Sequence, residues 1–341
     1  MAETETEIEC RNLWKIYGAR AEEALAAVRQ QVLSKEEVRD RFDCVLGVRD
    51  ASFTVAKGEI FCIMGLSGSG KSTLVRHINR LIEPTAGEIH VGGRRIDTMD
   101  EAALRQLRAE TIGMVFQHMA LWPHRTLADN VAFGLEVRGV SAAERRDAAE
   151  RALASMDLAG WSDHYPDQLS GGMQQRVGLA RALAADPEIL LMDEPFSALD
   201  PLIRRQLQDQ FLDLSQRVKK TTVFITHDLD EAIRMGDHIA IMNDGVIVQI
   251  GTPEEIVTQP VDAYVAEFVK GISRVSLVRA ETIMTPLGNA APSAKAVGPD
   301  SPLAEIMDHF MEDQEPVTVL SPEGSPLGQI TITDALRALK G

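Results

Sequence analysis

The chain has 341 residues, 45% of them hydrophobic, and a net charge of −16, which is typical of a globular protein with two or three domains. The acidic balance argues against nucleic acid as the main partner, because a negative surface repels phosphate backbones. Cys10, Cys44 and Cys62 form no C-x-x-C pair, so we expect a reducing compartment and no structural zinc site. The acidic start contains no signal peptide, and no apolar run is long enough to span a bilayer.

The first part of the chain predicts a β region that a helical segment interrupts. Residues 8–18 (IECRNLWKIYG) begin with strand-like alternation, and a strand pattern returns at residues 50–55 (DASFTV). Between them, at about 19–46, apolar residues recur at helical spacing. Ser34 and Glu37 form a capping box that predicts the start of a second short helix within this insertion.

Farther along, buried strands alternate with helices up to about residue 250. The predicted strands are EIFCIMG (59–65), EIHVGG (88–93), IGMVFQ (112–117), EILLMDE (188–194), TTVFITH (221–227) and the hairpin HIAIMNDGVIVQI (238–250). Residues 121–185 are mostly helical. This alternation predicts an α/β fold with a mainly parallel sheet and helices on its faces.

The C-terminal part predicts a small α+β unit. Residues 251–272 form a linker helix in this interpretation, and 285–302 form a loop rich in Pro, Ala and Gly. One helix, two short strands and a final helix follow. The unit would therefore occupy about residues 273–341.

A glycine-rich loop provides the first chemical signal. GLSGSGKS (65–72) fits G-x-x-x-x-G-K-[ST] and lies between a buried strand and a helix. Its backbone N–H groups would surround phosphates, Lys71 would supply charge, and Ser72 a hydroxyl for Mg²⁺. The loop alone does not distinguish a kinase, a GTPase and a transport ATPase. The residues expected to contact nucleotide here are Gly65, Ser67, Gly68, Ser69, Gly70, Lys71, Ser72 and Thr73.

Two carboxylates end the strand ILLMDE. Asp193 is placed to face the metal, usually through water, and Glu194 to act as general base or water-orienting group for attack on the γ-phosphate. The alternative is a strand that ends in solvated acids.

A second stretch suited to anions lies about a hundred residues downstream. LSGGMQQ (169–175) starts a helix with a serine able to cap it and free N–H groups that attract an anion. It resembles the signature motif of ABC-type ATPases, in which the signature of one subunit faces the glycine loop of another. The resemblance implies a homodimer holding two ATP molecules, with Ser170, Gly171 and Gly172 contacting the γ-phosphate in trans. The alternative is an ordinary capped helix.

Further motifs follow in the order that this family has. Gln117 resembles the Q-loop glutamine, which reaches Mg²⁺ and links the site to a transmembrane partner. Residues 197–200 (SALD) resemble the D-loop, and Asp200 would line the nucleotide. His227 resembles the switch histidine. The resemblance thus implies an ABC cassette with a RecA-like core, an antiparallel β subdomain and a helical subdomain, over residues 1–250.

Two assignments near this site stay open. Tyr17 resembles the aromatic residue that stacks on adenine, with Trp14 as its rival, and either side chain is also suited to the core. Residues 118–125 (HMALWPHR) would form part of the groove that receives a coupling helix of the permease. Their apolar members are also suited to the core.

The sequence of several longer stretches narrows the resemblance to the ATPase subunits of quaternary-amine osmoprotectant importers, the glycine betaine, proline betaine and choline family. The stretches GLSGSGKSTLVRHINRLIEPTAGEI and FITHDLDEAIRMGDHIAIM carry it, as does the helical insertion. It implies ATP and Mg²⁺ as cofactors, permease subunits as partners, an indirect solute-binding protein, and a peripheral location on the cytoplasmic face of the plasma membrane. DEPFSALD is the general importer form, which leaves room for another small-molecule importer.

Two other classes fit less well. An ABC ATPase acting on nucleic acid usually carries zinc modules, a coiled-coil insertion or tandem cassettes, and the sequence shows none of them. A P-loop kinase or GTPase would lack the signature motif.

The C-terminal unit resembles a CBS repeat, notably in GQITITDALRAL. In such repeats a Thr followed by an Asp three positions later holds a ribose, here Thr331 and Asp334. The alternative is that Asp334 only caps the last helix. The resemblance associates the unit with sensing ionic strength or a cyclic dinucleotide, although this sequence shows no basic patch there.

Overall fold

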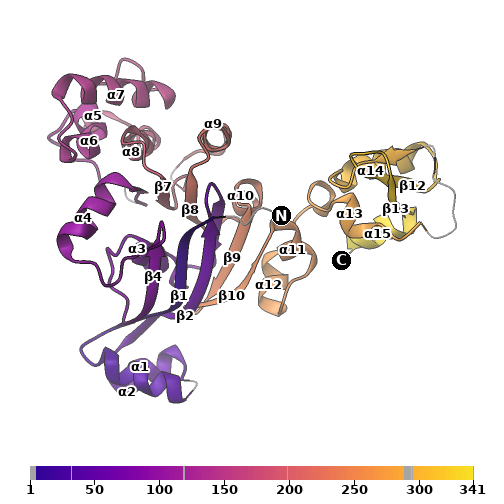
Figure 1. Ribbon diagram of the computed structural model, residues 1–341, viewed down its shortest axis with the longest axis horizontal. Helices are drawn as coiled ribbons and strands as arrows, with labels where there is room; N and C mark the ends of the chain where they lie inside the picture. Colours follow the sequence, from indigo (N-terminus) through magenta and orange to yellow (C-terminus); the bar gives the residue numbers. More distant parts are fainter. Residues whose placement is uncertain are drawn as a thin grey trace. The chain divides into compact units, whose positions relative to one another are not determined.

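The computed structural model divides the chain into two compact units, Met1–Ile250 and Gly251–Gly341, shown in Figure 1. It describes residues 5–31, 33–117, 120–197, 199–287, 293 and 295–340. Within these ranges, no helix combines the length and the apolar character that a membrane span requires.

A six-stranded sheet forms the centre of the first unit. In spatial order its strands are β10 (Val246–Gly251), β9 (His238–Asn243), β3 (Ile60–Met64), β8 (Thr221–Thr226), β7 (Ile189–Asp193) and β6 (Ile112–Val115). The pairs from β9 to β6 are parallel. Every residue of β3, β7 and β8 is buried, as expected for parallel strands covered on both faces.

The register of this sheet brings the predicted chemistry to one edge. Met64 at the end of β3 pairs with Thr226 of β8, and Asp193 at the end of β7 pairs with Ile225. Because the strands are parallel, the segments that follow them leave from the same edge. That edge is where ligands bind in open α/β sheets.

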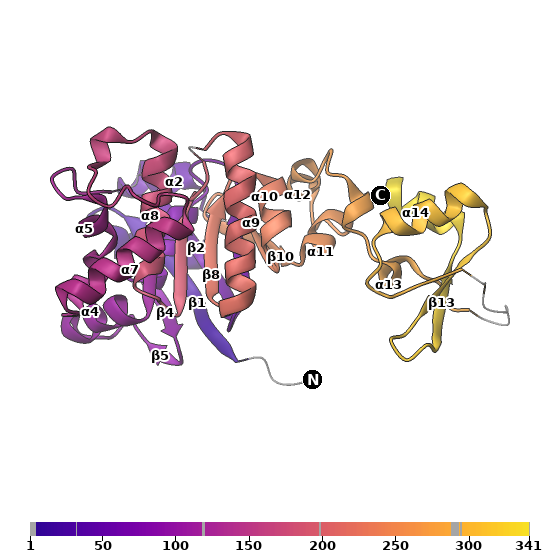
Figure 2. The ribbon, with the colours of Figure 1, turned by 90° about the horizontal axis from the view of Figure 1, so that it is seen from above.

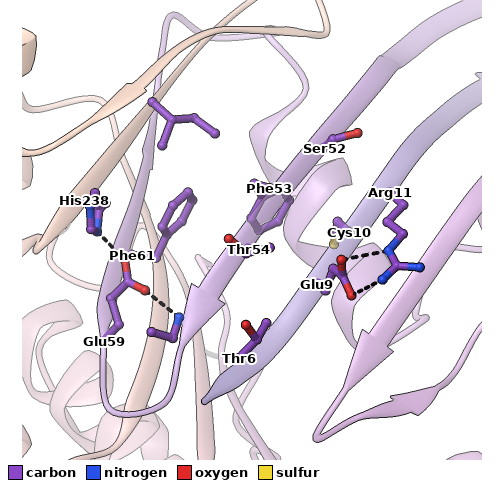
Figure 3. A pocket seen from close by; sticks show the side chains of 12 residues that line it. Thr6, Glu9, Cys10, Arg11, Ser52, Phe53, Thr54, Glu59, Phe61 and His238 are labelled. Carbon is purple, nitrogen blue, oxygen red and sulfur yellow. Dashed lines mark hydrogen bonds and ion pairs between the residues drawn. The ribbon is translucent and has the colours of Figure 1, made fainter. Parts of the chain in front are cut away.

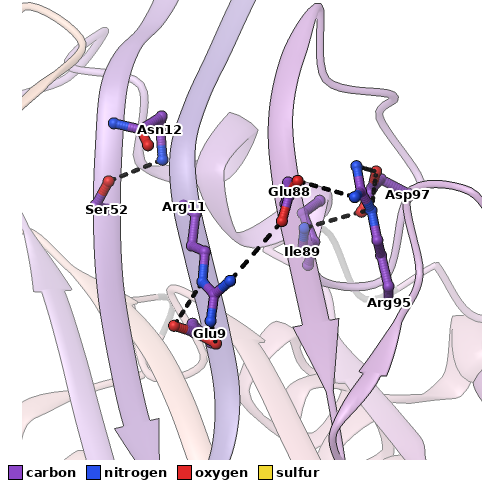
Figure 4. A network of polar contacts seen from close by, with 8 residues as sticks. All are labelled: Glu9, Arg11, Asn12, Ser52, Glu88, Ile89, Arg95 and Asp97. Atoms are coloured by element: carbon purple, nitrogen blue, oxygen red, sulfur yellow. Dashed lines mark hydrogen bonds and ion pairs between the residues drawn. The ribbon is translucent and has the colours of Figure 1, made fainter.

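A second, antiparallel sheet has the order β2 (Val45–Ala56), β1 (Thr6–Tyr17), β4 (Ala86–Val91) and β5 (Arg94–Arg95). Its outer face carries a charged network, shown in Figure 4: Arg11 contacts Glu9 at 2.7 Å and Glu88 at 3.9 Å, and Arg95 contacts Glu88 at 2.8 Å. Such exposed cross-strand pairs contribute little stability individually. The prediction of a β region at the start of the chain is confirmed, although the short strand β5 was not predicted.

A cavity of 580 Å³ lies where β1 and β2 face β3 and β9 (Figure 3). Phe53 and Phe61 stack in its wall with ring centres 5.2 Å apart. Glu59 Oε1, from the residue just before β3, and His238 Nδ1, from the first residue of β9, lie 2.7 Å apart. No predicted site residue lines this cavity, so it is separate from the edge described above.

The helical insertion forms α1 (Ala21–Gln30) and α2 (Lys35–Phe42), between β1 and β2. The predicted capping box is present: Ser34 Oγ accepts a hydrogen bond from the Glu37 amide, and the Glu37 carboxylate accepts one from the Ser34 amide. Val28 and Val38 are buried together with Trp14 and Leu46 in a core of their own. The insertion is therefore a folded part of the unit.

The remaining helices of this unit form two groups. Those between residues 127 and 184, which lie together in Figures 1 and 2, are α5 (Leu127–Val131), α6 (Phe133–Val137), α7 (Ala142–Ser155) and α8 (Gly171–Ala184). The first three of these pack on α8, and α8 in turn contacts β6. The second group is α3 (Lys71–Ile78), α4 (Glu101–Glu110), α9 (Pro201–Val218) and α10 (Leu229–Met235).

The second unit begins with two helices where one linker helix was expected. They are α11 (Pro253–Thr258) and α12 (Ala263–Phe268). Pro260 interrupts the helical backbone, and the Asp262 carboxylate starts a new helix by accepting a hydrogen bond from the Val265 amide at 2.9 Å. The helices belong to the same compact unit as the rest of the C-terminal part.

A three-stranded sheet and two longer helices complete this unit. They are β11 (Ala296–Val297), α14 (Leu303–Glu312), β12 (Val317–Leu320), β13 (Pro326–Ile330) and α15 (Ile332–Lys340), preceded by the short helix α13 (Ala280–Ile283). The strand β11 lies in the stretch predicted as a loop. It is two residues long and parallel to β12, so its sequence has no alternation to reveal it.

Candidate functional site

The glycine loop is folded around its own lysine. Lys71, at the start of α3, is buried, and its Nζ donates hydrogen bonds to the carbonyls of Gly65 (2.8 Å) and Leu66 (2.9 Å). Burial lowers the pKa of Lys71, while the carboxylates of Glu194 and Asp193 oppose that shift. The cation is thus held under the loop, where phosphate oxygens would meet it.

Two residues of this loop, Gly70 and Ser69, have special surroundings. Gly70 has φ +103°, and a Cβ there would lie 2.3 Å from the Gly47 carbonyl oxygen, so the position requires glycine. Ser69 is buried, and its hydroxyl has no hydrogen-bond partner in the described part of the chain. A buried hydroxyl without a partner is what a phosphate-binding loop offers to its ligand.

The first carboxylate after β7 is tied to the loop helix. Asp193 is fully buried and accepts hydrogen bonds from Ser72 Oγ (2.9 Å) and from Arg76 (3.1 Å). No cluster of three His, Cys, Asp or Glu side chains suited to a metal occurs among the described residues. The oxygen donors present fit a cation that also takes ligands from phosphates and water, as Mg²⁺ does.

The second carboxylate is held by the two residues that the motifs predicted. Glu194 Oε2 accepts a hydrogen bond from Gln117 Nε2 at 3.2 Å and lies 3.4 Å from His227 Nδ1. Glu194 also adopts φ +50°, an uncommon conformation for a residue other than glycine that is found at functional sites. The strand ends of β6, β7 and β8 therefore bring Gln117, Glu194 and His227 together.

The structure separates the two aromatic candidates. Trp14 is buried among the residues of the insertion. Tyr17 is 38% exposed, and its hydroxyl lies 3.1 Å from Thr73 Oγ1 at the start of the loop helix. Of the two rings, only that of Tyr17 is available beside the loop.

The signature stretch lies at the start of α8. Ser170 caps the helix by accepting a hydrogen bond from the Met173 amide at 3.3 Å, and both Ser170 and Gly171 are exposed. No hydrogen bond in the described ranges joins Ser170 to residues 65–72. Asp200 similarly caps α9, through the Ile203 amide at 3.1 Å. Within one chain, these residues are thus not part of the loop's own surroundings.

Two residues were missed from the sequence. Gln175 is buried and donates from Nε2 to the Glu194 carbonyl at 3.3 Å, so it connects the signature helix to the Glu194 backbone. It is the last letter of the quoted LSGGMQQ, which was the available signal. Arg76, which binds Asp193, lies on a helix whose sequence carries no motif beyond Thr73.

The predicted permease groove lies partly outside the described residues, which exclude His118 and Met119. In the remainder, Trp122 packs against Phe133 at 4.2 Å, and Arg125 lies over both rings. This part of the segment is anchored to α6.

The sequence profile of the ABC transporter family matches residues 48–197. The chain is 48% identical to the glycine betaine/proline betaine transport ATP-binding protein of Escherichia coli, over 97% of this chain and 82% of that protein. It is 51% identical to a trimethylamine N-oxide transport ATP-binding protein of Ruegeria pomeroyi, over 80% of each. A solved dimeric ATP-binding cassette, bound to ADP and phosphate, has a TM-score of 0.62 and 32% identity, over 72% of this chain and 98% of that one.

These likenesses agree with the loop, the paired carboxylates and the signature helix described above. The fold is that of a P-loop ABC cassette, and the family consists of ATPases that bind ATP and drive transport. The chain belongs to the ATP-binding proteins of ABC transporters, in the family that includes the glycine betaine and proline betaine transport subunits.

Proposed function

We propose that this chain powers the import of small methylated or quaternary amines such as glycine betaine, proline betaine or choline. The names of its relatives support this solute class, and the trimethylamine N-oxide transporter shares the methylated nitrogen. In this proposal the chain works on the cytoplasmic face of the membrane, on permease subunits fed by a solute-binding protein. The alternative is another small-molecule importer.

Our assignment of the catalytic residues rests on one observation, the Glu194 carboxylate held between Gln117 and His227. An ionised Glu194 accepts a proton from the water that attacks the γ-phosphate. Gln117 and His227 orient that carboxylate and the water, and His227 also contacts the γ-phosphate. Lys71 and the loop amides, from Gly65 to Thr73, stabilise the charge that develops on the phosphate oxygens.

Ser72, Gln117 and Asp193 are the residues that would hold Mg²⁺ beside the phosphates. The cation would supply charge neutralisation at the phosphate oxygens. The buried Asp193, with its bond from Ser72, presents the oxygen donors that this requires. Arg76 balances the Asp193 charge in the same place.

The exposed start of α8 supports a composite site made by two copies of the chain. Ser170, Gly171 and Gly172 of one copy would contact the γ-phosphate held by the loop of the other, with Asp200 nearby. The solved cassette relative is a dimer. Tyr17, exposed beside the loop, would stack on the adenine.

We also propose that the C-terminal unit is a CBS-like module. Its order of strand, helix, two strands and helix, from β11 to α15, supports this. Thr331 and Asp334 bond to each other reciprocally, Thr331 Oγ1 donating to the carboxylate at 2.6 Å and accepting from the Asp334 amide at 3.3 Å. This is the geometry of a helix cap, which favours the capping alternative over a ribose-binding role.

The test is uptake of labelled glycine betaine, choline, proline betaine and trimethylamine N-oxide by cells that express the chain with its permease and binding protein. We expect uptake of at least one of them, and loss of uptake with Glu194→Gln. Purified Glu194→Gln protein should turn over ATP about 10²- to 10⁴-fold more slowly and still bind it. Unchanged turnover contradicts the general base, whereas intact ATPase activity without any uptake contradicts only the solute class.

A further inference from the structure

The helical insertion reaches the phosphate loop through one side chain. Lys35 is the first residue of α2, and its Nζ lies 3.3 Å from the Gly68 carbonyl oxygen and donates a hydrogen bond to it. The same ammonium group lies 3.3 Å from the Asp244 carboxylate, in the turn between β9 and β10. Lys35 thereby connects three segments that are far apart in sequence.

The contact is part of a closed set of bonds behind the loop. The Gly245 amide donates to the Ser69 carbonyl at 2.9 Å, and the Arg49 amide donates to the Gly245 carbonyl at 2.8 Å. The Arg49 guanidinium in turn binds the Leu33 carbonyl, two residues before Lys35. The loop, the turn after β9, strand β2 and the insertion are thus joined in a ring.

Lys35 is held in place from its own side. Leu33 is buried, Val38 is buried in the core of the insertion, and the capping box of Ser34 and Glu37 fixes the first turn of α2. The Lys35 side chain is 24% exposed, against 58% for Lys57, which pairs with Glu5 on the surface. Because the Lys35 side chain is already partly ordered, its contact with the loop costs little additional conformational entropy.

The loop residue that Lys35 holds has open space where a side chain would be. Gly68 has φ +79°, no side chain, and nothing within 4 Å of the position a Cβ would take. The peptide group after Gly68 is planar, so fixing its carbonyl also fixes the Ser69 amide. The Ser69 amide donates to the Leu66 carbonyl at 3.2 Å, and the Gly68 carbonyl accepts from Lys35.

We propose that Lys35 is a positioning residue of the nucleotide site: by holding the Gly68 carbonyl it keeps the loop in its phosphate-binding shape, and the insertion thereby sets the affinity for ATP. The inference rests on the proposed role of the loop as the phosphate site. A cation at this position also adds positive charge beside an anion-binding loop. Asp244 holds the ammonium group from the other side.

The test is equilibrium binding of a fluorescent ATP analogue and steady-state hydrolysis by the purified full-length chain. We expect Lys35→Ala to raise the Kd about fivefold to tenfold, as loss of one partly exposed hydrogen bond does. The KM should rise in parallel and kcat should stay within about twofold, because the contact exists before and during the reaction. Lys35→Arg, which keeps a cationic donor, should restore the Kd to within about twofold.

Lys57→Ala is the matched control, since it removes an exposed lysine elsewhere on the same unit, and it should leave Kd and kcat unchanged. Asp244→Asn should raise the Kd less than Lys35→Ala does, because Lys35 keeps its bond to Gly68. Thermal unfolding of each variant without nucleotide checks that it is folded.

Three results would overturn the proposal. The first is a Kd for Lys35→Ala that matches the Lys57→Ala control, and the second is an effect of Lys35→Ala on kcat alone. The third is a loss of binding that Lys35→Arg does not restore, with both Lys35 variants unfolded. Failure of the loop assignment itself is separate. In that case Lys71→Ala, which removes the cation under the loop, would bind the analogue as wild type does.

Discussion

The chain has two helix starts suited to phosphate, and they differ in how much of their surroundings the chain itself supplies. Around the loop at 65–72, Lys71 binds two loop carbonyls, Ser72 binds Asp193, and Ser69 binds the turn at Gly245. Around the signature start at 169–175, Ser170 caps its own helix, and Gln174 binds the nearby carbonyls of Pro166 and Leu169. The first site is braced by several distant segments, whereas the second is braced locally as far as Gln174, and within the described ranges Gln175 alone of this stretch bonds to a distant segment, at Glu194.

The two starts also differ in which groups of a phosphate site one chain supplies to them. Beside the loop, one chain supplies the buried Lys71, the Asp193 carboxylate that we propose for the metal, and Glu194, the proposed general base. The signature start has exposed residues at a helix end, and within the described ranges no Lys or Arg side chain bonds to Ser170 or Gly171. It therefore becomes a phosphate site only when another surface brings the phosphate to it, which in our proposal is the loop of a second copy.

The largest expected effect is on nucleotide binding, which should depend on the loop and not on the signature start of the same chain. Lys71→Ala should weaken binding of a fluorescent ATP analogue to the purified chain about 100-fold, because a buried charge to the phosphates is lost. Ser170→Arg, at an exposed position, should leave binding by one chain within about twofold and abolish hydrolysis. If Ser170→Arg weakens binding as much as Lys71→Ala, the signature start contributes to the loop's site in the same chain, and the comparison fails.

Mixing the two inactive variants sharpens the same point. In a mixed dimer, the Ser170→Arg chain supplies an intact loop and the Lys71→Ala chain an intact signature, so one of the two sites is complete. Half of randomly paired dimers are mixed, so ATPase activity should return to about a quarter of the wild-type value. Each variant alone serves as its control. A mixture as inactive as its components would argue that the two starts act within one chain.

Gln175 bonds the signature helix to the Glu194 backbone, so changing it tests whether the two regions communicate inside a chain. Gln175→Ala should lower kcat about tenfold and leave KM nearly unchanged, because it alters how Glu194 is held and not how ATP binds. Gln106→Ala, on the surface of α4, is the control. A rise in KM with normal kcat would assign Gln175 to nucleotide binding instead.

The smallest expected effect is on the pH dependence of stability. Burial lowers the pKa of His77, on the loop helix, to about 4, and its Nδ1 contacts the Thr73 carbonyl. The unfolded chain then takes up this proton below about pH 6.5 while the folded chain does not, so stability falls as pH drops from 6.5 toward 4. Between pH 7.5 and 5.5 the loss from this group is about 1 kcal/mol.

Chemical denaturation at the two pH values measures this loss. The free energy of unfolding of His77→Gln should fall less than that of wild type between the two pH values, by that amount. His124→Gln, which alters an exposed histidine, should lose as much stability as wild type does. The signature helix contains no histidine and so makes no such contribution. An unchanged pH dependence in His77→Gln would contradict the buried neutral state.

Local patterns in the sequence were enough to predict most elements of the first unit. Fully apolar runs such as residues 189–193 predict buried strands, and Ser34 with Glu37 predicts the start of α2, because these signals act over a few residues. The short strands β5 and β11 escaped prediction, since two residues have no period. Pro260 and Asp262 do carry a local signal for the break between α11 and α12, which an interpretation as one linker helix overlooked.

By itself the sequence determined the chemistry of this protein: a P-loop, paired carboxylates after a buried strand, a signature stretch and a histidine after β8, because residue type and spacing define those motifs. Only the tertiary structure decided which of them share a site. It placed Gln117 and His227 beside Glu194 and left Tyr17, not Trp14, exposed beside the loop. It also bonded Gln175 of the signature stretch to the Glu194 backbone, and brought Arg76 and Lys35 to the site from positions that no motif marks. The physical reason is that such contacts depend on strand order and on packing between distant segments, which no local pattern encodes.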